Sequence, residues 1–185
     1  MIFLPTLLQG AYFIDMEKRH DSRGYFARTM CGAEFEERGL VSHFVQTNHS
    51  HSVVRGTLRG MHFQRPPHME AKLVRCVRGA IYDVIVDLRE GSPTYLRSQA
   101  VELSAMNGRS LYVPEGFAHG FQTLADNTDV IYAVSHPYSP AAEAGVRYDD
   151  ATLGISWPEP ISVISERDAA WPPFRTSTSG RAMPS

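Results

Sequence analysis

The sequence predicts a mostly β protein with a jelly-roll barrel or sandwich architecture. Short runs rich in β-branched and aromatic residues recur along the chain, such as Ile-Tyr-Asp-Val-Ile-Val-Asp-Leu at 81–88. Turn-forming residues separate these runs, as in Glu-Gly-Ser-Pro at 90–93 and Met-Asn-Gly-Arg at 106–109. Many short strands at this spacing are typical of a sandwich or a barrel, and of a jelly roll in particular.

The elements follow in order from this pattern. The apolar opening segment 1–8 predicts a first strand, and Ala33–Arg38 predicts a short peripheral helix that ends at Gly39. Further strands are expected at 72–78, 80–88, 98–104, 110–114 and 129–135. The first two of these meet at Arg78-Gly79, which predicts a hairpin. Residues 157–173 are expected to form loops and a short helix that pack back on the barrel.

Length and charge restrict the classes of protein to consider. With 185 residues, the chain has room for one domain, expected at 1–174, followed by a tail at 175–185 whose Ser, Thr and Gly content predicts disorder. The formal charge of −2 excludes a strongly basic nucleic-acid binder. No apolar run approaches the roughly 18 residues that a membrane-spanning helix needs, so we expect no membrane association.

The two cysteines indicate the cellular compartment. Cys31 and Cys76 form neither a Cys-x-x-Cys pair nor a zinc-type spacing, and Cys76 lies inside a strand pattern, where it is expected to be a core thiol. The opening segment lacks the basic region and cleavage site of a secretory signal. A reducing cytoplasm is therefore the expected location.

Two motifs place a histidine among glycines and suggest a functional cavity. His62 ends Arg-Gly-Thr-Leu-Arg-Gly-Met-His, and His119 lies in Pro-Glu-Gly-Phe-Ala-His-Gly-Phe. Glycine permits bends and close backbone approaches that other residues resist. An extended segment at 61–64 puts His62 and Gln64 on one face, and an irregular step at Gly60 would bring Arg59 to the same face. Lys72 begins the next strand. A lone core histidine is the competing interpretation of His62.

Other polar residues allow two interpretations each. His119 is equally compatible with a substrate contact and with a structural hydrogen bond. Tyr132 alternates with valines and, by pattern alone, is an aromatic on an inward strand face. Tyr138 lies in a predicted loop, where an exposed phenol is often a ligand contact. Asp168 alone has the pattern of a surface carboxylate.

A metal site is the alternative suggested by His49 and His51. Alternate strand residues point the same way, so these two imidazoles could chelate one ion together with His119. The surrounding Asn-His-Ser-His-Ser run is polar and turn-prone, however, which favours solvated loop histidines. No dinucleotide-binding, Walker or serine-hydrolase motif is present.

Taken together, the motifs resemble the dTDP-4-dehydrorhamnose 3,5-epimerase family, a branch of the cupin superfamily that acts on nucleotide-linked 4-keto-6-deoxy sugars. The resemblance extends from about Tyr12 to Asp168. It rests on Asp-Ser-Arg-Gly-Tyr-Phe at 21–26, Gln-Thr-Asn at 46–48, Leu-Arg-Gly-Met-His-Phe-Gln at 58–64, Lys-Leu-Val-Arg at 72–75, Pro-Glu-Gly-Phe-Ala-His-Gly-Phe at 114–121 and Ser-Glu-Arg-Asp at 165–168. Metal-dependent cupins instead follow His-x-His with a glutamate ligand, where this chain has Arg55 and Gly56.

The resemblance implies a catalytic set and a substrate. His62 would be the general base, Asp168 would polarise its imidazole, Lys72 would stabilise the enolate oxygen, and Tyr132 would return a proton from the opposite face. The implied substrate contacts are Arg23, Gln46, Asn48, Arg59, His119 and Tyr138. Because the C4 ketone of such a sugar acidifies C3 and C5, neither a cofactor nor a metal is expected.

The resemblance also implies a homodimer in which an N-terminal strand joins the sheet of the neighbouring chain. Three other hypotheses remain: an epimerase that acts at C3 alone, a metal-dependent cupin enzyme, and a sugar-binding module without catalysis.

Overall fold

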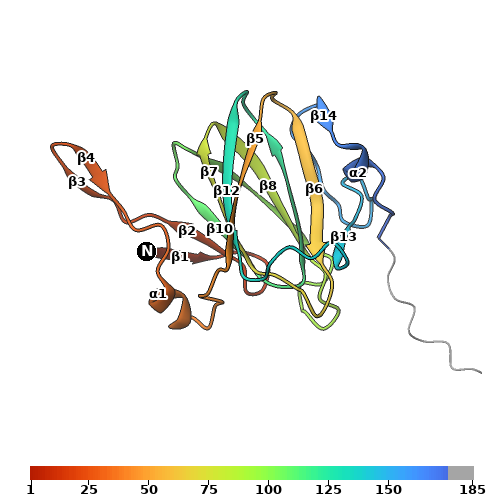
Figure 1. Cartoon of the computed structure of the whole chain (residues 1–185), viewed down its shortest axis with the longest axis horizontal. Helices are drawn as coiled ribbons and strands as arrows, with labels where there is room; N and C mark the ends of the chain where they lie inside the picture. The colour runs from red at the N-terminus through yellow and green to blue at the C-terminus, as the bar shows by residue number, and fades with distance from the viewer. Residues whose placement is uncertain (175–185) are drawn as a thin grey trace, which may run out of the picture.

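Two facing β-sheets form the body of the molecule (Figure 1) in the computed structural model, which describes residues 1–174. The first sheet has six strands in the order β1-β2-β10-β7-β12-β5. Their bounds are β1 (Ile2–Pro5), β2 (Tyr12–Asp15), β10 (Ser110–Val113), β7 (Lys72–Arg78), β12 (Thr128–Val134) and β5 (Gln46–Ser52). The neighbouring strands in this sheet pair antiparallel.

The second sheet has the order β13-β6-β11-β8-β9, and a short strand β14 pairs parallel with β6. Its strands are β13 (Glu143–Gly145), β6 (Thr57–Gln64), β11 (Phe117–Thr123), β8 (Ala80–Asp87), β9 (Ser98–Ser104) and β14 (Val163–Ile164). Helix α2 (Glu166–Ala169) lies beside β6 at the C-terminal end of the described chain (Figure 1). The mostly β, cupin-type sandwich that the sequence predicts is confirmed.

The core lies between the sheets and on both outer faces. Between the sheets, β7, β8, β10, β11 and β12 bury apolar side chains that include Val74, Ile85 and Phe121. A second cluster around Met61 covers the outer face of the second sheet with the segment after β13. A third cluster packs Phe35 of helix α1 (Gly32–Glu36) against the first sheet. Apolar packing therefore covers both faces of each sheet over part of its area.

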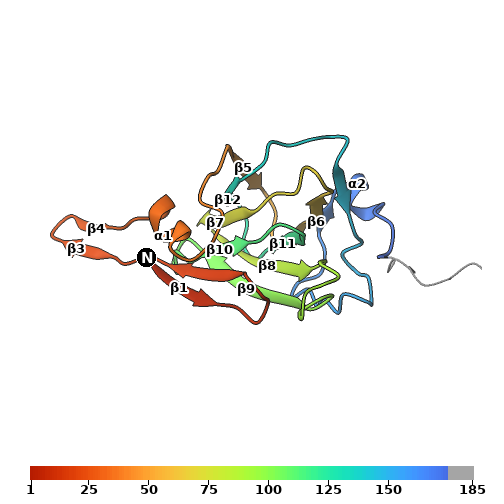
Figure 2. The same ribbon diagram turned by 90° about the horizontal axis from the view of Figure 1, so that it is seen from below.

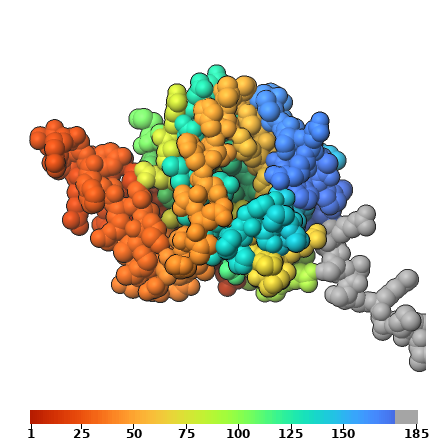
Figure 3. Space-filling view, in the orientation of Figure 1, coloured from red at the N-terminus to blue at the C-terminus, as the bar shows by residue number. Residues whose placement is uncertain are grey.

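A two-stranded hairpin stands away from this body. Strands β3 (Arg19–Asp21) and β4 (Gly24–Phe26) pair only with each other, and every residue in them is exposed. Figures 2 and 3 show the same red-orange segment projecting from the compact part of the molecule. Tyr25 and Phe26 expose 49% and 73% of their surface, which is unusual for two adjacent aromatic residues.

The predicted hairpin at Arg78-Gly79 is wrong, although the strands on either side of it are confirmed. β7 belongs to the first sheet and β8 to the second, so the chain crosses between sheets at Gly79. This glycine has a φ of +74°, and a Cβ there would lie 2.4 Å from Thr128 Oγ1. The same turn residues serve a hairpin and a crossover, because the choice depends on which strands pair and not on the turn itself.

The interpretation of 48–52 as a turn-prone run is also wrong. The whole segment 46–52 is strand β5, which pairs with β12 along its full length. Its residues alternate between the interior of the sandwich and the exposed outer face, so polar residues are compatible with a strand here.

The other predicted elements need only small changes. The predicted helix at Ala33–Arg38 is α1 at Gly32–Glu36, and Gly39 takes a φ of +66° just beyond it. The opening strand is confirmed as β1, and 157–173 contains loops, β14 and α2. The predicted tail at 175–185 lies outside the described residues. Among the described residues, no helix has the length and hydropathy needed to cross a lipid bilayer.

Candidate active site

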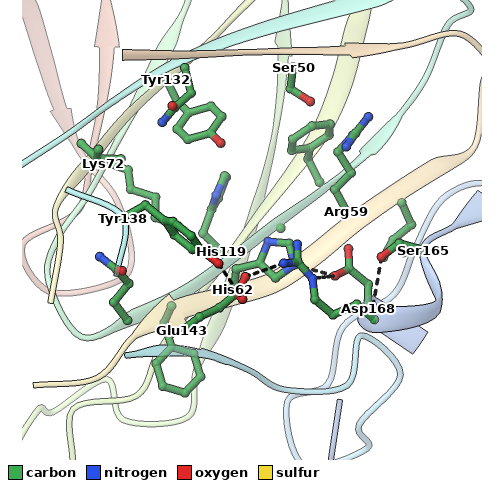
Figure 4. A pocket seen from close by; sticks show the side chains of 18 of the residues that line it. Ser50, Arg59, His62, Lys72, His119, Tyr132, Tyr138, Glu143, Ser165 and Asp168 are labelled. Carbon is green, nitrogen blue, oxygen red and sulfur yellow. Dashed lines mark hydrogen bonds and ion pairs between the residues drawn. The ribbon is translucent and has the colours of Figure 1, made fainter. Parts of the chain in front are cut away.

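A cavity of about 640 Å³ opens between the two sheets. Strands β5, β7 and β12 supply one wall and β6 and β11 the other, while α2 closes one side. Figure 4 shows side chains from both sheets pointing into this space. Nine of the ten site residues expected from the sequence line it: Gln46, Asn48, Arg59, His62, Lys72, His119, Tyr132, Tyr138 and Asp168.

His62 and Asp168 form a direct pair. His62 Nε2 lies 2.7 Å from Asp168 Oδ1, and the carboxylate, which only accepts, assigns the Nε2 proton to the imidazole. The backbone N–H of Gly60 donates to the other oxygen, Oδ2, at 3.1 Å. Asp168 is only 3% exposed. Nδ1 of His62 is therefore the ring nitrogen left to take a proton.

The pKa of Asp168 is lowered from its usual value. Burial acts to raise it, but the hydrogen bond and charge of His62 and the N–H of Gly60 together outweigh burial. The short helix α2 positions the carboxylate. The side-chain oxygen of Ser165 caps the start of this helix by accepting the backbone N–H of Asp168 at 3.1 Å. The carboxylate is therefore held ionised behind the imidazole.

The irregular step predicted at Gly60 is confirmed. His119 of β11 pairs with His62 of β6, and Phe121, two residues later, pairs with Arg59, three residues earlier. The register of the two strands therefore shifts between these pairs. Gly60 has a φ of +127°, and a Cβ on it would lie 2.6 Å from the Cα of Gly120. Only glycines at both positions allow the strands to come this close. The step puts Arg59 and His62 on the same wall of the cavity.

Tyr132 faces His62 from the opposite sheet. Figure 4 shows the phenol reaching into the cavity from β12 while His62 enters from β6. The pKa of Tyr132 is raised, first because the ring is buried and second because the charge of Glu70 disfavours the phenolate, against a lowering effect of Arg59. The phenol is therefore protonated at neutral pH, and the cavity holds a proton acceptor on one side and a proton donor on the other.

Lys72 is the third member of the expected catalytic set. Its ammonium lies 3.2 Å from Glu70 Oε1, and the two side chains are 9% and 12% exposed. Lys72 comes from the first residue of β7, next to the loop that carries Glu70. A positive charge is thus fixed at the cavity wall on a largely buried side chain, where electrostatic interactions are stronger than in bulk water.

The polar floor of the cavity is held by internal hydrogen bonds. The guanidinium of Arg59 donates to Ser52 Oγ at 3.2 Å and to the carbonyl of His51 at 2.9 Å. Gln46 donates to Asn48 Oδ1 at 2.7 Å. These bonds fix the directions of a cation and two amides that can bind phosphate and hydroxyl groups.

His119 carries a second histidine–carboxylate pair. Its Nε2 lies 2.8 Å from Asp83 Oδ1, and both residues are buried. The other carboxylate oxygen of Asp83 has no hydrogen-bond partner among the described residues. His119 also lines the cavity. It therefore makes a structural hydrogen bond and also lies where a substrate could contact it, so both interpretations of this residue fit the structure.

A chain of polar contacts borders the cavity mouth. The hydroxyl of Tyr138 donates to Glu143 Oε2 at 3.0 Å, and Arg167 Nη1 lies 2.8 Å from Glu143 Oε1. The hydrogen bond to Glu143 raises the pKa of Tyr138. The contacts connect the loop after β12 to β13 and α2.

Comparisons with known proteins agree with this geometry. A family model described as dTDP-4-dehydrorhamnose 3,5-epimerase matches residues 5–176. The chain is 48% identical to the dTDP-4-dehydrorhamnose 3,5-epimerase of Methanothermobacter thermautotrophicus over 94% of each chain. The chain belongs to the dTDP-4-dehydrorhamnose 3,5-epimerase family. The isomerase class expected from the sequence is confirmed with it.

Two solved structures add detail on bound nucleotides. The Bacillus anthracis dTDP-4-dehydrorhamnose 3,5-epimerase, crystallised with TDP and PPi bound, superposes with a TM-score of 0.90 at 40% identity, covering 94% of this chain and 99% of that one. ChmJ, a 3'-monoepimerase from Streptomyces bikiniensis in complex with dTDP-quinovose, superposes with a TM-score of 0.84 at 36% identity, covering 91% of this chain and 86% of that one. The relatives thus include both a 3,5-epimerase and a monoepimerase.

One expected site residue of this epimerase-family chain lies outside the cavity. Arg23 is in the projecting hairpin, where its side chain is 88% exposed and pairs with Asp21 at 2.6 Å. It does not line the cavity of its own chain. The expected role of Arg23 as a substrate contact therefore stays a prediction, which the cavity of one chain does not supply.

The metal alternative has no geometric support in this member of the epimerase family. His49 and His51 both contact Asp129 Oδ1, at 2.9 and 2.7 Å, and neither lines the cavity that contains His119. Within residues 1–174, no group of three His, Cys, Asp or Glu side chains is arranged to hold a metal ion. The three histidines of that hypothesis do not form one site.

Sequence reasoning missed four charged residues of the epimerase-family site, namely Glu70, Asp83, Glu143 and Arg167. Asp83 and Asp87 are the two carboxylates of a strand run that is otherwise largely apolar, so a buried carboxylate there was a detectable signal. Arg167 lies in the Ser-Glu-Arg-Asp motif, from which only Asp168 was selected, whereas Glu70 and Glu143 lie in polar segments where no local pattern distinguishes them.

Proposed function

We propose that this chain is a cofactor-independent epimerase of a nucleotide-linked 4-keto-6-deoxy sugar, converting dTDP-4-dehydro-6-deoxyglucose to dTDP-4-dehydrorhamnose. The observation that carries the proposal is the opposition of His62 and Tyr132 across one cavity, with the ammonium of Lys72 in the same space (Figure 4). An acceptor and a donor on opposite faces of a sugar ring invert a carbon, because the proton leaves from one face and returns to the other.

The steps follow from the positions of these groups. Nδ1 of His62 removes the proton from C3, next to the C4 ketone, and the electron pair moves to the ketone oxygen to give an enolate. Lys72 stabilises this oxygen, a contribution on the order of 10²–10³ in rate. Tyr132 then donates its proton to C3 from the opposite face, and exchange with water restores both side chains. The same sequence at C5 completes a double epimerisation.

The rest of the cavity supports a nucleotide-sugar substrate. Arg59 offers a guanidinium, which suits a diphosphate. Gln46, Asn48, His119 and Tyr138 supply amide, imidazole and phenol groups around it. The solved relatives that carry TDP or dTDP-quinovose support the choice of a thymidine nucleotide. The two free thiols, Cys31 and Cys76, support a cytoplasmic location.

Inversion at C3 alone is the second candidate, and the structural similarity to the 3'-monoepimerase ChmJ is the observation that favours it. Both candidates use the same base, acid and ammonium. They differ in whether the intermediate turns so that C5 reaches His62.

The chain is also proposed to act as a homodimer. β1 is an edge strand whose outer side is unpaired in the described chain, and the projecting hairpin exposes Tyr25 and Phe26. A second copy would cover these surfaces. It would also give Arg23 a role, because a hairpin that extends away from its own chain can reach the cavity of a partner.

The test is hydrogen exchange during turnover. We would incubate the protein with dTDP-4-keto-6-deoxyglucose in deuterated water and follow C3 and C5 by proton NMR, with His62→Ala beside it. Deuterium at both carbons, lost in the variant, supports the 3,5-epimerase. Deuterium at C3 alone supports the monoepimerase. Tight binding without exchange at either carbon would contradict both and identify a sugar-binding module.

A further inference from the structure

Glu70 is a largely buried carboxylate in the cavity to which the mechanism above gives no task. Its side chain is 12% exposed, and it lies in the loop that leads into β7. Each of its oxygens has a different partner. Oε1 lies 3.2 Å from the ammonium of Lys72, and Oε2 accepts the amide N–H of Gln64 at 3.2 Å. One carboxylate thus connects two residues of the cavity wall.

The pair with Lys72 fixes the position of the positive charge. The Lys72 side chain is only 9% exposed, so few directions are open from which water could reach it. An ammonium left without a partner at such a place is strongly unfavourable. Lysine has four rotatable bonds and a point charge, so without a fixed partner its ammonium would turn towards solvent.

Gln64 anchors the carboxylate from the other side. Its amide nitrogen also lies 3.0 Å from the carbonyl of His68 and 3.3 Å from that of Pro137, and its amide oxygen accepts the N–H of Ser139 at 2.6 Å. Gln64 therefore joins the end of β6 to both loops at the cavity mouth. Because Gln64 holds Oε2 of Glu70, the carboxylate is a fixed partner for the Lys72 ammonium.

Glu70 also acts on Tyr132 through space. Its negative charge is, after burial, the next contribution to the raised pKa of the phenol. The other charged or titratable groups around the same cavity are Arg59, His62, Lys72, His119, Tyr138, Glu143, Arg167 and Asp168. Of these, only Arg59 contributes resolvably to Tyr132, and it acts in the opposite direction.

We propose that Glu70 is the positioning residue of this site: its two oxygens, one on Lys72 and one on Gln64, hold the Lys72 ammonium beside the substrate ketone. Its negative charge also adds to the effect of burial on Tyr132. The inference rests on the proposed function for its consequences in catalysis. The effect of the Glu70 charge on the pKa of Tyr132 is a property of the protein without substrate, so it does not depend on the proposed function. A glutamine at position 70 carries no charge and has an NH₂ group in place of one carboxylate oxygen, so one of the two partners, Lys72 or Gln64, loses the acceptor atom that it has in Glu70.

The catalytic test compares Glu70→Gln with Glu70→Asp and with Glu159→Gln. Glu159 is a matched control, because it is also paired with a cation, Arg55, but lies outside the cavity. We expect kcat of Glu70→Gln to fall about tenfold or more while KM changes less than about threefold, because the lost interaction acts on the enolate. The basic limb of its kcat–pH profile should move to lower pH. Glu70→Asp should recover that limb.

A second readout does not require turnover. Tyrosine labelled with ¹³C at Cζ reports the titration of each phenol by NMR, and Tyr132→Phe assigns the signal. We expect the Tyr132 midpoint to lie at lower pH in Glu70→Gln than in wild type, Glu70→Asp or Glu159→Gln. An unchanged midpoint overturns the inference even if the epimerase activity is confirmed. A lowered midpoint in a protein that lacks epimerase activity would support the electrostatic part and contradict the proposed function.

Discussion

At the scale of single residues, the site is a set of charges whose partners fix both their position and their protonation. Asp168 holds His62 in one tautomer, Glu70 holds Lys72, and burial keeps Tyr132 in its neutral form. Asp168 is remote in sequence from His62, and Glu70 lies in a loop beside Lys72. The predictions at this scale therefore concern a residue together with its partner.

The first prediction concerns the base. His62→Ala should lower kcat by roughly 10²–10⁴-fold, the range for a positioned general base, and should abolish deuterium incorporation at C3. The melting temperature should stay within a few degrees of the wild type, because the imidazole is partly exposed and removing it leaves Asp168 its bond to Gly60. His49→Ala is the control, since His49 lies outside the cavity. A His62→Ala enzyme with near-normal turnover would eliminate this histidine as the base.

The second prediction concerns Asp87, a fully buried carboxylate that serves stability. Burial alone would raise its pKa, but hydrogen bonds from Arg89, Ser92 and Thr94 lower it to about 2 from the usual 3.8. A depressed pKa stabilises the folded state above pH 3.8, and this contribution is lost as pH falls towards 2. Asp87→Asn should therefore lower the free energy of unfolding by about 2 kcal/mol at pH 7.

Urea denaturation at several pH values checks this prediction. The stability gap between wild type and Asp87→Asn should narrow once the pH falls below about 4. The exposed Asp149→Asn should show a gap of less than about 1 kcal/mol throughout, because surface ion pairs contribute little. A gap for Asp87→Asn that stays constant down to pH 3 would contradict the assignment.

At the scale of elements, the site depends on how closely β6 and β11 approach each other. Gly60 and Gly120 are in contact at the register shift, and the same segment donates the Gly60 N–H to Asp168. A bulge at a site residue commonly redirects a side chain. Here it turns Arg59 onto the wall that carries His62.

The third prediction uses two glycines with nearly equal backbone angles. Gly60 has a φ of +127° and Gly24 of +129°, but a Cβ on Gly60 would lie 2.6 Å from Gly120 Cα while one on Gly24 meets nothing within 4 Å. Gly24→Ala should cost roughly 1–2 kcal/mol from backbone strain alone. Gly60→Ala should cost about 2 kcal/mol more and reduce kcat, because the strands must separate. Equal losses from thermal melts of both variants would show that the close approach is unimportant.

At the scale of the whole molecule, one chain does not contain every expected site residue. Nine of the ten line the cavity, whereas Arg23 stands at the tip of a hairpin that extends away from it. The proposed dimer resolves this difference if each hairpin serves the cavity of the other chain. Size-exclusion chromatography with light scattering should accordingly give twice the chain mass of 20.7 kDa.

The fourth prediction is complementation between two impaired variants. Arg23→Ala should raise KM, because a phosphate contact is lost, and His62→Ala should remove turnover. After denaturation and joint refolding, mixed dimers should contain one cavity with an intact His62 and an intact hairpin from the partner chain. Roughly a quarter of the wild-type activity should return, since random mixing makes half the dimers mixed and each has one intact site. No recovery above the separately refolded variants would refute the shared site.

Much of the fold could be predicted because strand formation is local. The alternation and β-branched content of 72–78 and 98–104 gave strand bounds that the structure reproduces. Sheet membership is not local, and Gly79 illustrates this: the residues on either side of it form strands as expected, but in different sheets. Strand 46–52 was hidden by its polar composition, which reflects a cavity on one face and solvent on the other.

The amino-acid sequence was sufficient to predict the class of fold, most of the strands, the family, and nine of the residues that line the cavity. Which of these residues are partners depends on how the two sheets pack. His62 and Asp168 are 106 residues apart, and His119 meets Asp83 across two neighbouring strands. The physical reason is that strand periodicity and turn chemistry depend on adjacent residues, whereas the distance between two side chains depends on how whole sheets pack. Charges such as Glu70 acquire a function only after that packing removes them from water.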